Sequence, residues 1–201
     1  MKHLLTMETT FFERWTRVIR DNDKPDTEIE IRLGKMNRGS FDTNVTRETY
    51  EKVLRRLKKY NGWEDVCESD TSRFYYANNR RTTYDNVKED ITECVTKKRL
   101  LVDDASLKDR PFDVRLGVSS EKPCAHDDEE EYTKVRNVKR TSFLRKNLRI
   151  DVSVVSGDPD DHDSENETEY QIELELLHVP EKPHELYNML YKIFDVLDIT
   201  L

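Results

Sequence analysis

The chain has 201 residues, of which 38% are charged and 35% hydrophobic, and its formal net charge is −8. A chain of this length can bury one sizeable core, and the alternation of apolar and polar residues in its segments excludes wholesale disorder. The three cysteines form no CxxC pair and the five histidines show no zinc-ligand spacing, so the sequence argues against a zinc module and favours a reducing intracellular compartment.

The negative charge is concentrated in two segments. Residues 127–131 are five consecutive acids, and residues 157–169 hold seven acids and no lysine or arginine. The rest of the chain has 34 basic and 30 acidic residues, so we expect the folded body to be basic in places. We expect a single domain over residues 1–201, with acidic loops at about 121–131 and 157–169.

The N-terminal part is predicted to hold two helices and one strand between them. The first helix covers residues 10–21, and its apolar stripe is formed by Phe11, Trp15, Val18 and Ile19. The strand covers residues 27–34, and a turn follows at residues 37–40. The second helix covers residues 46–60, with Thr46 as its N-cap residue. Residues 1–10 lack the long apolar run of a signal peptide.

From residue 63 onward the apolar period changes to two, which predicts a series of strands. They cover residues 71–77, 80–84, 89–101, 112–119, 132–143, 148–155 and 169–177. About eight short-linked strands favour a sheet closed on itself or an antiparallel sandwich. A final helix at residues 180–198 has a broad apolar stripe, which is compatible with packing beneath the sheet or with a dimer contact. No apolar stretch approaches the roughly 20 residues of a membrane-spanning helix.

The first and last predicted strands each carry paired glutamates on one face. Glu28 and Glu30 share a face with Arg32, and Glu173 and Glu175 share a face near the C-terminus. Four carboxylates brought together repel one another unless a cation or arginines neutralise them. The alternative is that both are edge strands whose glutamates are solvated.

The strands between them also have charged faces. The shared faces are Lys97 with Arg99; Asp113, Arg115, Gly117, Ser119 and Glu121; Arg136, Val138, Arg140 and Ser142; and Arg149, Asp151 and Ser153. If the sheet closes with its apolar faces outward, acids and bases line the lumen and can grip an anionic ligand. An open sheet whose charged face meets water is equally compatible with this pattern.

Several of these strands resemble a known family. The motifs are Glu28-Ile-Glu30-Ile-Arg32-Leu-Gly34, Phe112-Asp-Val-Arg-Leu-Gly-Val-Ser-Ser-Glu121, Val138-Lys-Arg-Thr-Ser-Phe143, Arg149-Ile-Asp151-Val-Ser153 and Ile172-Glu-Leu-Glu175. They resemble the metal-dependent RNA 5′-triphosphatases of mRNA capping, of the fungal, protozoan and large-DNA-virus type. These enzymes belong to the triphosphate tunnel metalloenzyme superfamily. The small size of the chain is most similar to the stand-alone viral and protozoan enzymes.

The resemblance implies a β-dominated α+β fold, in which a closed eight-stranded antiparallel barrel with a charged lumen encloses a triphosphate and is packed by a few helices. It implies Glu28, Glu30 and Glu175 as ligands of Mg²⁺ or Mn²⁺, for which oxygen ligands are suited. The implied catalytic residues are Lys97, Arg99, Arg115, Arg136, Arg140, Arg149, Asp151 and Glu173. The basic members are expected to grip phosphates. Arg32 is compatible with pairing to a carboxylate instead.

Two acidic side chains in this set have more than one implied role. Glu173 is expected to orient a neighbouring base or the attacking water. Asp151 is expected to hold a basic side chain in place, with water activation as the alternative. The sequence departs from the family pattern at Gln171, where a third Glu is frequent, and at Val138, where a Lys is frequent. Lys139 takes that position if the strand register slips by one residue.

The implied function is removal of the γ-phosphate from 5′-triphosphate RNA as the first step of mRNA capping, together with Mn-dependent hydrolysis of nucleoside triphosphates. The implied partners are RNA 5′ ends, nucleoside triphosphates and a guanylyltransferase. The protein is expected to be a monomer or homodimer, without membrane attachment, in the nucleus, a cytoplasmic viral factory or a virion.

Two alternative functions remain open. One is a tunnel-fold hydrolase of another triphosphate, such as a nucleoside triphosphate, inorganic triphosphate or thiamine triphosphate. The other is a non-catalytic RNA-binding module. The second lacks a basic strand with interleaved aromatic residues of the sort that stacks bases, and Tyr75 and Tyr76 are the nearest to one.

Overall fold

The computed structural model describes residues 2–127, 129–157 and 168–201. The described strands are β1 (Thr27–Asn37), β2 (Ser40–Asp42), β3 (Asp65–Tyr75), β4 (Arg80–Asp85), β5 (Asp90–Ala105), β6 (Asp113–Pro123), β7 (Lys134–Arg145), β8 (Leu148–Ser156) and β9 (Glu169–Leu176). The described helices are α1 (Lys2–Asp21), α2 (Arg47–Lys58) and α3 (Pro183–Thr200).

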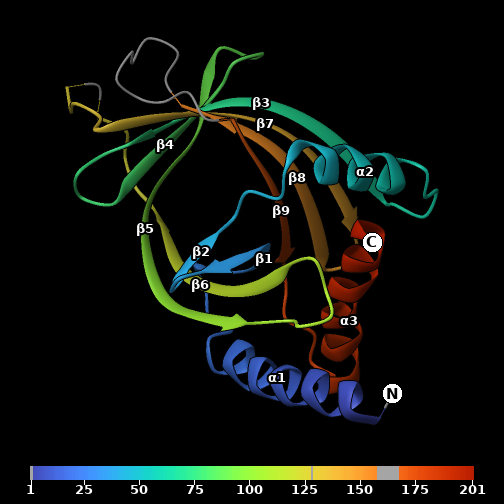
Figure 1. Ribbon diagram of the computed structural model, residues 1–201. Coiled ribbons are helices and arrows are strands. Elements are labelled where there is room, and N and C mark those ends of the chain that lie inside the picture. The colour runs from blue at the N-terminus through green and yellow to red at the C-terminus, as the bar shows by residue number, and fades with distance from the viewer. Residues whose placement is uncertain (1, 128, 158–167) are drawn as a thin grey trace.

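Eight of these strands form a closed antiparallel barrel (Figure 1). Their order is β1-β6-β5-β4-β3-β7-β8-β9, and β9 pairs back onto β1. The three-residue strand β2 forms a hairpin with the end of β1 and stays outside the barrel. The predicted closed eight-stranded sheet is therefore confirmed, and the sandwich and the open sheet are excluded.

The apolar faces of four neighbouring strands, β1, β6, β8 and β9, point outward and form the strand side of the core. Their buried residues include Ile29, Ile31, Leu33, Val114, Leu116, Val118, Ile150, Val152, Ile172 and Leu174. Because successive residues of a strand point to opposite faces, the polar residues between these positions face the lumen. The alternation that predicts the strands therefore also places the charges inside the barrel.

The three helices cover this apolar outer surface. In Figure 1, α1 lies beneath the barrel, whereas α3 and α2 lie along its right-hand side, with α2 next to β8. Trp15 of α1, Val53 of α2 and Leu190 of α3 are fully buried in the same core. The predicted apolar stripe of the C-terminal helix thus packs against the barrel. None of these helices, among the described residues, is long and apolar enough to cross a membrane.

The longest strand, β5, changes its inward face at a bulge. Its pairing with β6 shifts between Arg99 and Leu101, which leaves Leu100 as an extra, exposed residue. Bulges bend a strand and increase its twist, and Figure 1 shows β5 curving around one side of the barrel. Beyond the bulge, Asp104 lies opposite Arg115 on the neighbouring strand.

Some predicted boundaries differ from the structure. The first helix begins at Lys2 instead of residue 10, and β3 begins at Asp65 instead of residue 71. The acidic loop predicted at about 121–131 begins later than expected, because Glu121 to Pro123 belong to β6. In the other predicted acidic loop, residues 158–167 lie outside the described residues, as does residue 128 of the first loop.

Candidate active site

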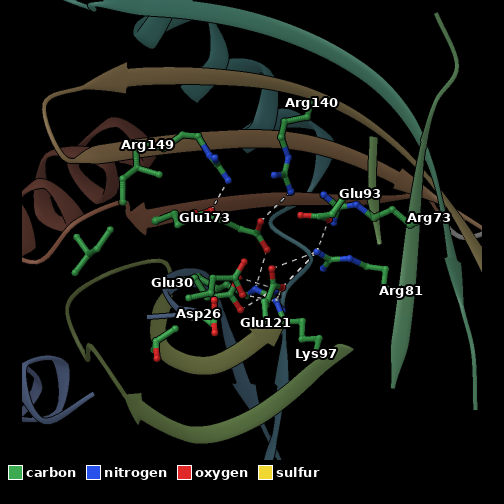
Figure 2. Close-up of a pocket in the computed structure, with 16 residues that line it drawn as sticks. Asp26, Glu30, Arg73, Arg81, Glu93, Lys97, Glu121, Arg140, Arg149 and Glu173 are labelled. Carbon is green, nitrogen blue, oxygen red and sulfur yellow. Dashed lines mark hydrogen bonds and ion pairs between the residues drawn. The ribbon is translucent and has the colours of Figure 1, made fainter. Parts of the chain in front are cut away.

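The barrel encloses a cavity of about 350 Å³, a size within the range of small-molecule sites. Its charged lining consists of the acids Asp26, Glu28, Glu30, Glu93, Glu121, Glu173 and Glu175 and the bases Arg32, Arg73, Arg81, Lys97, Arg140 and Arg149. Seven of the predicted site residues line it directly: Glu28, Glu30, Glu173, Glu175, Lys97, Arg140 and Arg149. Both signs of charge therefore meet in one enclosed space (Figure 2).

Three of the acids, Glu28, Glu30 and Glu175, come together where β1 meets β9. Glu30 lies directly opposite Glu175 in the register of the two strands, and Glu28 is two residues away on the same face of β1. On the other side of β1, Glu30 lies opposite Gly117. A Cβ at that glycine would sit 3.2 Å from Glu30 Oε1, so the missing side chain leaves room for the carboxylate.

Each of these three carboxylates is paired with a base. Lys97 pairs with Glu28, which also accepts a hydrogen bond of 3.2 Å from the Ser119 hydroxyl. Arg149 pairs with Glu175. Arg32 pairs with Glu30 at 2.9 Å, as the sequence analysis allowed for Arg32. In this paired arrangement, no group of three acidic, histidine or cysteine side chains among the described residues is placed to hold a metal ion.

Burial makes two of these carboxylates hard to ionise. Burial is the main cause that raises the pKa of Glu30 to about 7, with Arg32 opposing and Glu173 and Glu28 adding to the rise. Burial likewise raises the pKa of Glu175 to about 7, with Arg149 opposing and Glu28 adding. The bases present do not fully compensate these acids, so the site has unused affinity for positive charge.

Glu173 has the opposite behaviour. Burial alone would raise its pKa, but Arg32 and Arg140 outweigh that effect, with help from Arg73, and the pKa falls to about 2. Arg32 Nε lies 2.7 Å and Arg140 Nη2 lies 3.2 Å from its carboxylate oxygens. Glu173 is therefore ionised at neutral pH and held in place by two guanidinium groups.

Asp151 is the buried acid that orients the basic side chains of β7 and β8. It is 1% exposed and accepts hydrogen bonds from Ser142 Oγ at 2.6 Å, Arg140 Nη1 at 2.7 Å and Arg149 Nε at 3.2 Å. The contacts agree with the expectation that Asp151 holds basic side chains. They direct the guanidinium groups of Arg140 and Arg149 into the cavity (Figure 2).

Besides Asp26 and Arg32, four charged residues that were not predicted as site residues line the cavity. They are Arg73 on β3, Arg81 on β4, Glu93 on β5 and Glu121 on β6. Arg81 pairs with Glu93 at 2.9 Å and with Glu121 at 3.3 Å. Among these four residues, the sequence marked only Glu121, which shares a strand face with Ser119. Arg81, Thr82 and Thr83 are all buried, so β4 shows no alternation that distinguishes its inner face.

Three predicted phosphate-binding residues do not line the cavity. Arg99 is exposed. Arg115 pairs with Asp104 at 2.6 Å and stacks over Phe41 at 4.5 Å from the ring centre. Arg136 is half-buried and lies opposite Arg73 in the register of β7 and β3.

The register of β7 agrees with the face predicted for Arg140. Val138, which lies two residues before Arg140 and therefore on the same strand face, is buried. The side chain of Lys139 is 75% exposed and faces Asp70 at 3.5 Å, so the alternative with Lys139 in the lumen is excluded. Gln171 donates hydrogen bonds to Glu169 and Thr43 instead of lining the cavity.

The carboxylates at the β1–β9 junction fit a hard divalent cation by their chemistry. Mg²⁺ and Mn²⁺ prefer oxygen ligands, and Glu28, Glu30 and Glu175 supply three carboxylates on adjoining strands. Burial raises the pKa values of Glu30 and Glu175 to about 7, and the neighbouring bases do not offset it. A cation at this junction would replace the present pairing with Lys97 and Arg149.

Comparisons with known proteins agree on the family. The sequence model of the family described as mRNA capping enzyme, beta chain, matches residues 68–182, more than half of the chain. No curated protein matches. The chain is similar to the Pct1 RNA triphosphatase of Schizosaccharomyces pombe, with a TM-score of 0.77, 14% identity and coverage of 96% of this chain and 91% of that one.

A second similar structure is Pct1 in complex with the Spt5 CTD, with a TM-score of 0.78, 13% identity and coverage of 94% and 91%. The Mimivirus capping enzyme triphosphatase is also similar, with a TM-score of 0.68, 16% identity and coverage of 94% and 96%. At these identities the structures show a shared fold, which is the tunnel fold that the resemblance implies. On the family match and this fold, the chain belongs to the mRNA capping enzyme, beta chain, family.

Proposed function

We propose that the protein is a metal-dependent RNA 5′-triphosphatase that removes the γ-phosphate of 5′-triphosphate RNA as the first step of mRNA capping. The observation that carries the proposal is the closed lumen, in which a wall of three carboxylates faces a wall of arginines. A triphosphate with a divalent cation has the complementary charges. Family membership supports the same substrate class.

Glu28, Glu30 and Glu175 would hold Mg²⁺ or Mn²⁺, which supplies neutralising charge to the phosphate oxygens. Lys97 and Arg149 are the bases that now pair with Glu28 and Glu175. With a cation on those carboxylates, both side chains would be free to bind phosphate. Arginine is suited to this task, because its planar fork matches a pair of phosphate oxygens.

Arg140 contributes a phosphate contact from the opposite wall, oriented by Asp151 and Glu173. Glu173 is ionised, and it accepts contacts from Arg140 and Arg32. It positions Arg140 or the water that attacks the γ-phosphorus in line with the leaving oxygen. The product is a 5′-diphosphate RNA end, the substrate for guanylyl transfer. Arg99, Arg115 and Arg136 are not included, because they do not line the cavity.

The same site would hydrolyse nucleoside triphosphates with Mn²⁺, because the contacts described involve only phosphate groups. A guanylyltransferase is the expected partner, since it uses the diphosphate end. We expect the enzyme to work inside the cell, as a monomer or a homodimer.

The test is the release of γ-phosphate by the purified protein from 5′-triphosphate RNA, a nucleoside triphosphate, inorganic triphosphate and thiamine triphosphate. Each substrate is assayed with Mg²⁺, with Mn²⁺ and with a chelator. The proposal predicts metal-dependent release from the RNA and a 5′-diphosphate product. Release from the small substrates alone would favour the other tunnel hydrolases, and no release from any substrate would favour the non-catalytic module.

A further inference from the structure

Two of the three cysteines of the chain lie side by side on neighbouring strands. Cys94 belongs to β5, and Cys124 directly follows the last residue of β6. Their sulfur atoms are 3.0 Å apart, and both are free thiols. The third cysteine, Cys67, is an exposed free thiol on β3. The fold thus brings together two thiols that are 30 residues apart in the sequence.

The backbone around these two thiols has the geometry that a disulfide requires. Val95 lies opposite Pro123 in the register of β5 and β6. Their neighbours Cys94 and Cys124 are therefore opposite each other, and the Cys124 amide donates to the Cys94 carbonyl at 3.0 Å. Opposed residues of antiparallel strands have Cα atoms about 4.5–5.5 Å apart, within the roughly 4.4–6.8 Å that a disulfide spans. Rotation of the side chains is enough to form the bond.

The thiol pair faces the outer surface of the barrel. Glu93, which precedes Cys94, lines the lumen, and successive residues of a strand point to opposite faces. Cys94 therefore points outward, and both Cys94 and Cys124 are partly exposed. A small oxidant in solution can reach the pair without entering the cavity, so chemistry at these thiols does not depend on the proposed function.

The neighbours of Cys94 favour the protonated form of its thiol. Cys94 Sγ donates to the Ala125 carbonyl oxygen at 3.4 Å, and the Thr82 hydroxyl donates to Cys94 Sγ at 3.7 Å. Burial raises the pKa of Cys94, its hydrogen bond with Cys124 adds to the rise, and Thr82 opposes it. Because the thiolate is the reactive form of cysteine, we expect Cys124 to react first with an oxidant.

We propose that Cys94 and Cys124 form a reversible oxidation site, which a hydroperoxide converts into an intramolecular disulfide. The Cys124 thiolate attacks one peroxide oxygen, the O–O bond breaks, and a sulfenic acid and hydroxide are formed. The Cys94 sulfur then displaces the sulfenic hydroxyl group as water, and the S–S bond forms. In total, the two thiols lose two electrons and two protons, and hydrogen peroxide becomes two waters. A dithiol reductant reverses the reaction, as for redox-sensing thiols in a reducing compartment.

The disulfide would fasten the connection between β6 and β7 to β5. In the sheet order, β5, β4 and β3 lie between β6 and β7, so this connection crosses three strands. Its described residues, 124–127 and 129–133, are held on β4 by the ion pair of Glu130 with Arg80. On β3, the Thr133 amide donates to the Tyr75 carbonyl at 2.7 Å. A covalent bond at Cys124 would fix the start of this connection as well.

The test counts thiols in the purified protein after treatment with hydrogen peroxide. Remaining thiols are alkylated with N-ethylmaleimide, and the protein is analysed by intact mass and peptide mapping. The wild type is expected to keep one alkylated thiol, Cys67, and to give a peptide pair linked between Cys94 and Cys124. Dithiothreitol should restore all three thiols. Three alkylated thiols after peroxide, or a main cross-link that includes Cys67, would overturn the proposal.

The matched variants are Cys67→Ser, Cys94→Ser and Cys124→Ser. Cys67→Ser is expected to form the same cross-link as the wild type, and the other two variants are expected to form no intramolecular cross-link. A wild type unfolded in urea should give mixed pairings that include Cys67, because the fold no longer selects the partners. The same mixture from the folded protein would show that the native geometry does not direct the reaction.

Thermal unfolding tests whether the bond fits the folded state. The oxidised wild type is expected to melt about 5 °C or more above the reduced protein, because the cross-link closes a long loop in the unfolded chain. Cys94→Ser should melt at the same temperature with and without peroxide. An oxidised wild type that melts at or below the temperature of the reduced protein would overturn the proposal, since the bond would then distort the strands.

Discussion

Glu30, Glu175 and Glu173 share one lumen but differ in how readily they ionise. Burial raises the pKa values of Glu30 and Glu175 to about 7, although Arg32 and Arg149 oppose the rise. Glu173 lies between Arg32 and Arg140, and its pKa is lowered to about 2. The environment therefore gives one residue type two behaviours: Glu173 is a fixed anion that orients bases, and Glu30 and Glu175 are the carboxylates that we propose to bind a cation.

This difference predicts the pH dependence of stability in the metal-free protein. The folded-state pKa of Glu30 and Glu175 exceeds the ordinary value of 4.5. Protonation therefore favours the folded state, fully below pH 4.5 and less as pH rises through 7. The melting temperature is expected to be higher near pH 5.5 than near pH 8. The contribution of Glu173 has the opposite sign and is lost only as pH falls from 4.5 towards 2.

The matched variants are the double variant Glu30→Gln/Glu175→Gln and the control Glu51→Gln, which changes an exposed acid on α2. The double variant should have a flatter profile between pH 5.5 and 8, and the control should keep the wild-type slope. Identical slopes in the wild type and the double variant would show that these two acids do not titrate as described.

The metal-ligand assignment predicts the effect of removing single carboxylates. Glu28→Ala, Glu30→Ala and Glu175→Ala should each reduce γ-phosphate release by about a hundredfold or more while the fold stays intact. Circular dichroism and the melting temperature check the fold. Near-wild-type activity in any of the three variants would remove that residue from the ligand set.

At the scale of elements, the strands with strict alternation were predictable and the irregular ones were not. In β1 and β9, alternate isoleucines and leucines identify the buried face, so the faces of Glu28 and Glu175 follow from the sequence. In β4, consecutive buried residues conceal the inner face of Arg81. In β5, the bulge at Leu100 exchanges the faces within one strand. Arg73 was missed because β3 carries polar residues on both faces, so neither face is marked as apolar.

The packing of α1 against the barrel predicts a contrast between two neighbouring residues that bind the same acid. Trp15 is fully buried and its Nε1–H donates to Asp103 Oδ2 at 3.0 Å, while Arg14 Nε donates to the same oxygen at 2.6 Å from a side chain that is 49% exposed. Trp15→Ala should lower the free energy of unfolding by about 3–5 kcal/mol.

Arg14→Ala should lower it by about 1 kcal/mol or less, because exposed ion pairs contribute little. Chemical denaturation of both variants gives the comparison. Equal losses would mean that α1 is attached to the barrel through its ion pair and not through its buried aromatic face.

The whole molecule reverses the usual arrangement of a barrel, in which the interior is apolar. Here the helices α1, α2 and α3 and the outward strand faces form the core, and the lumen is left for charge (Figure 1). In such an enclosed space, electrostatic interactions are stronger than in water. Closure by the four paired positions of β1 and β9 is what brings Glu30 beside Glu175.

The central claim is that the carboxylate wall holds a divalent cation while the arginine wall holds the phosphates. The most direct measurement is anomalous diffraction from crystals grown with Mn²⁺ and a non-hydrolysable β,γ-imido nucleoside triphosphate. We expect a manganese peak among Glu28, Glu30 and Glu175, and phosphate density against Arg140, Arg149 and Lys97. Manganese and nucleotide bound only on the outer surface, with these carboxylates still paired to Lys97, Arg32 and Arg149, would contradict it.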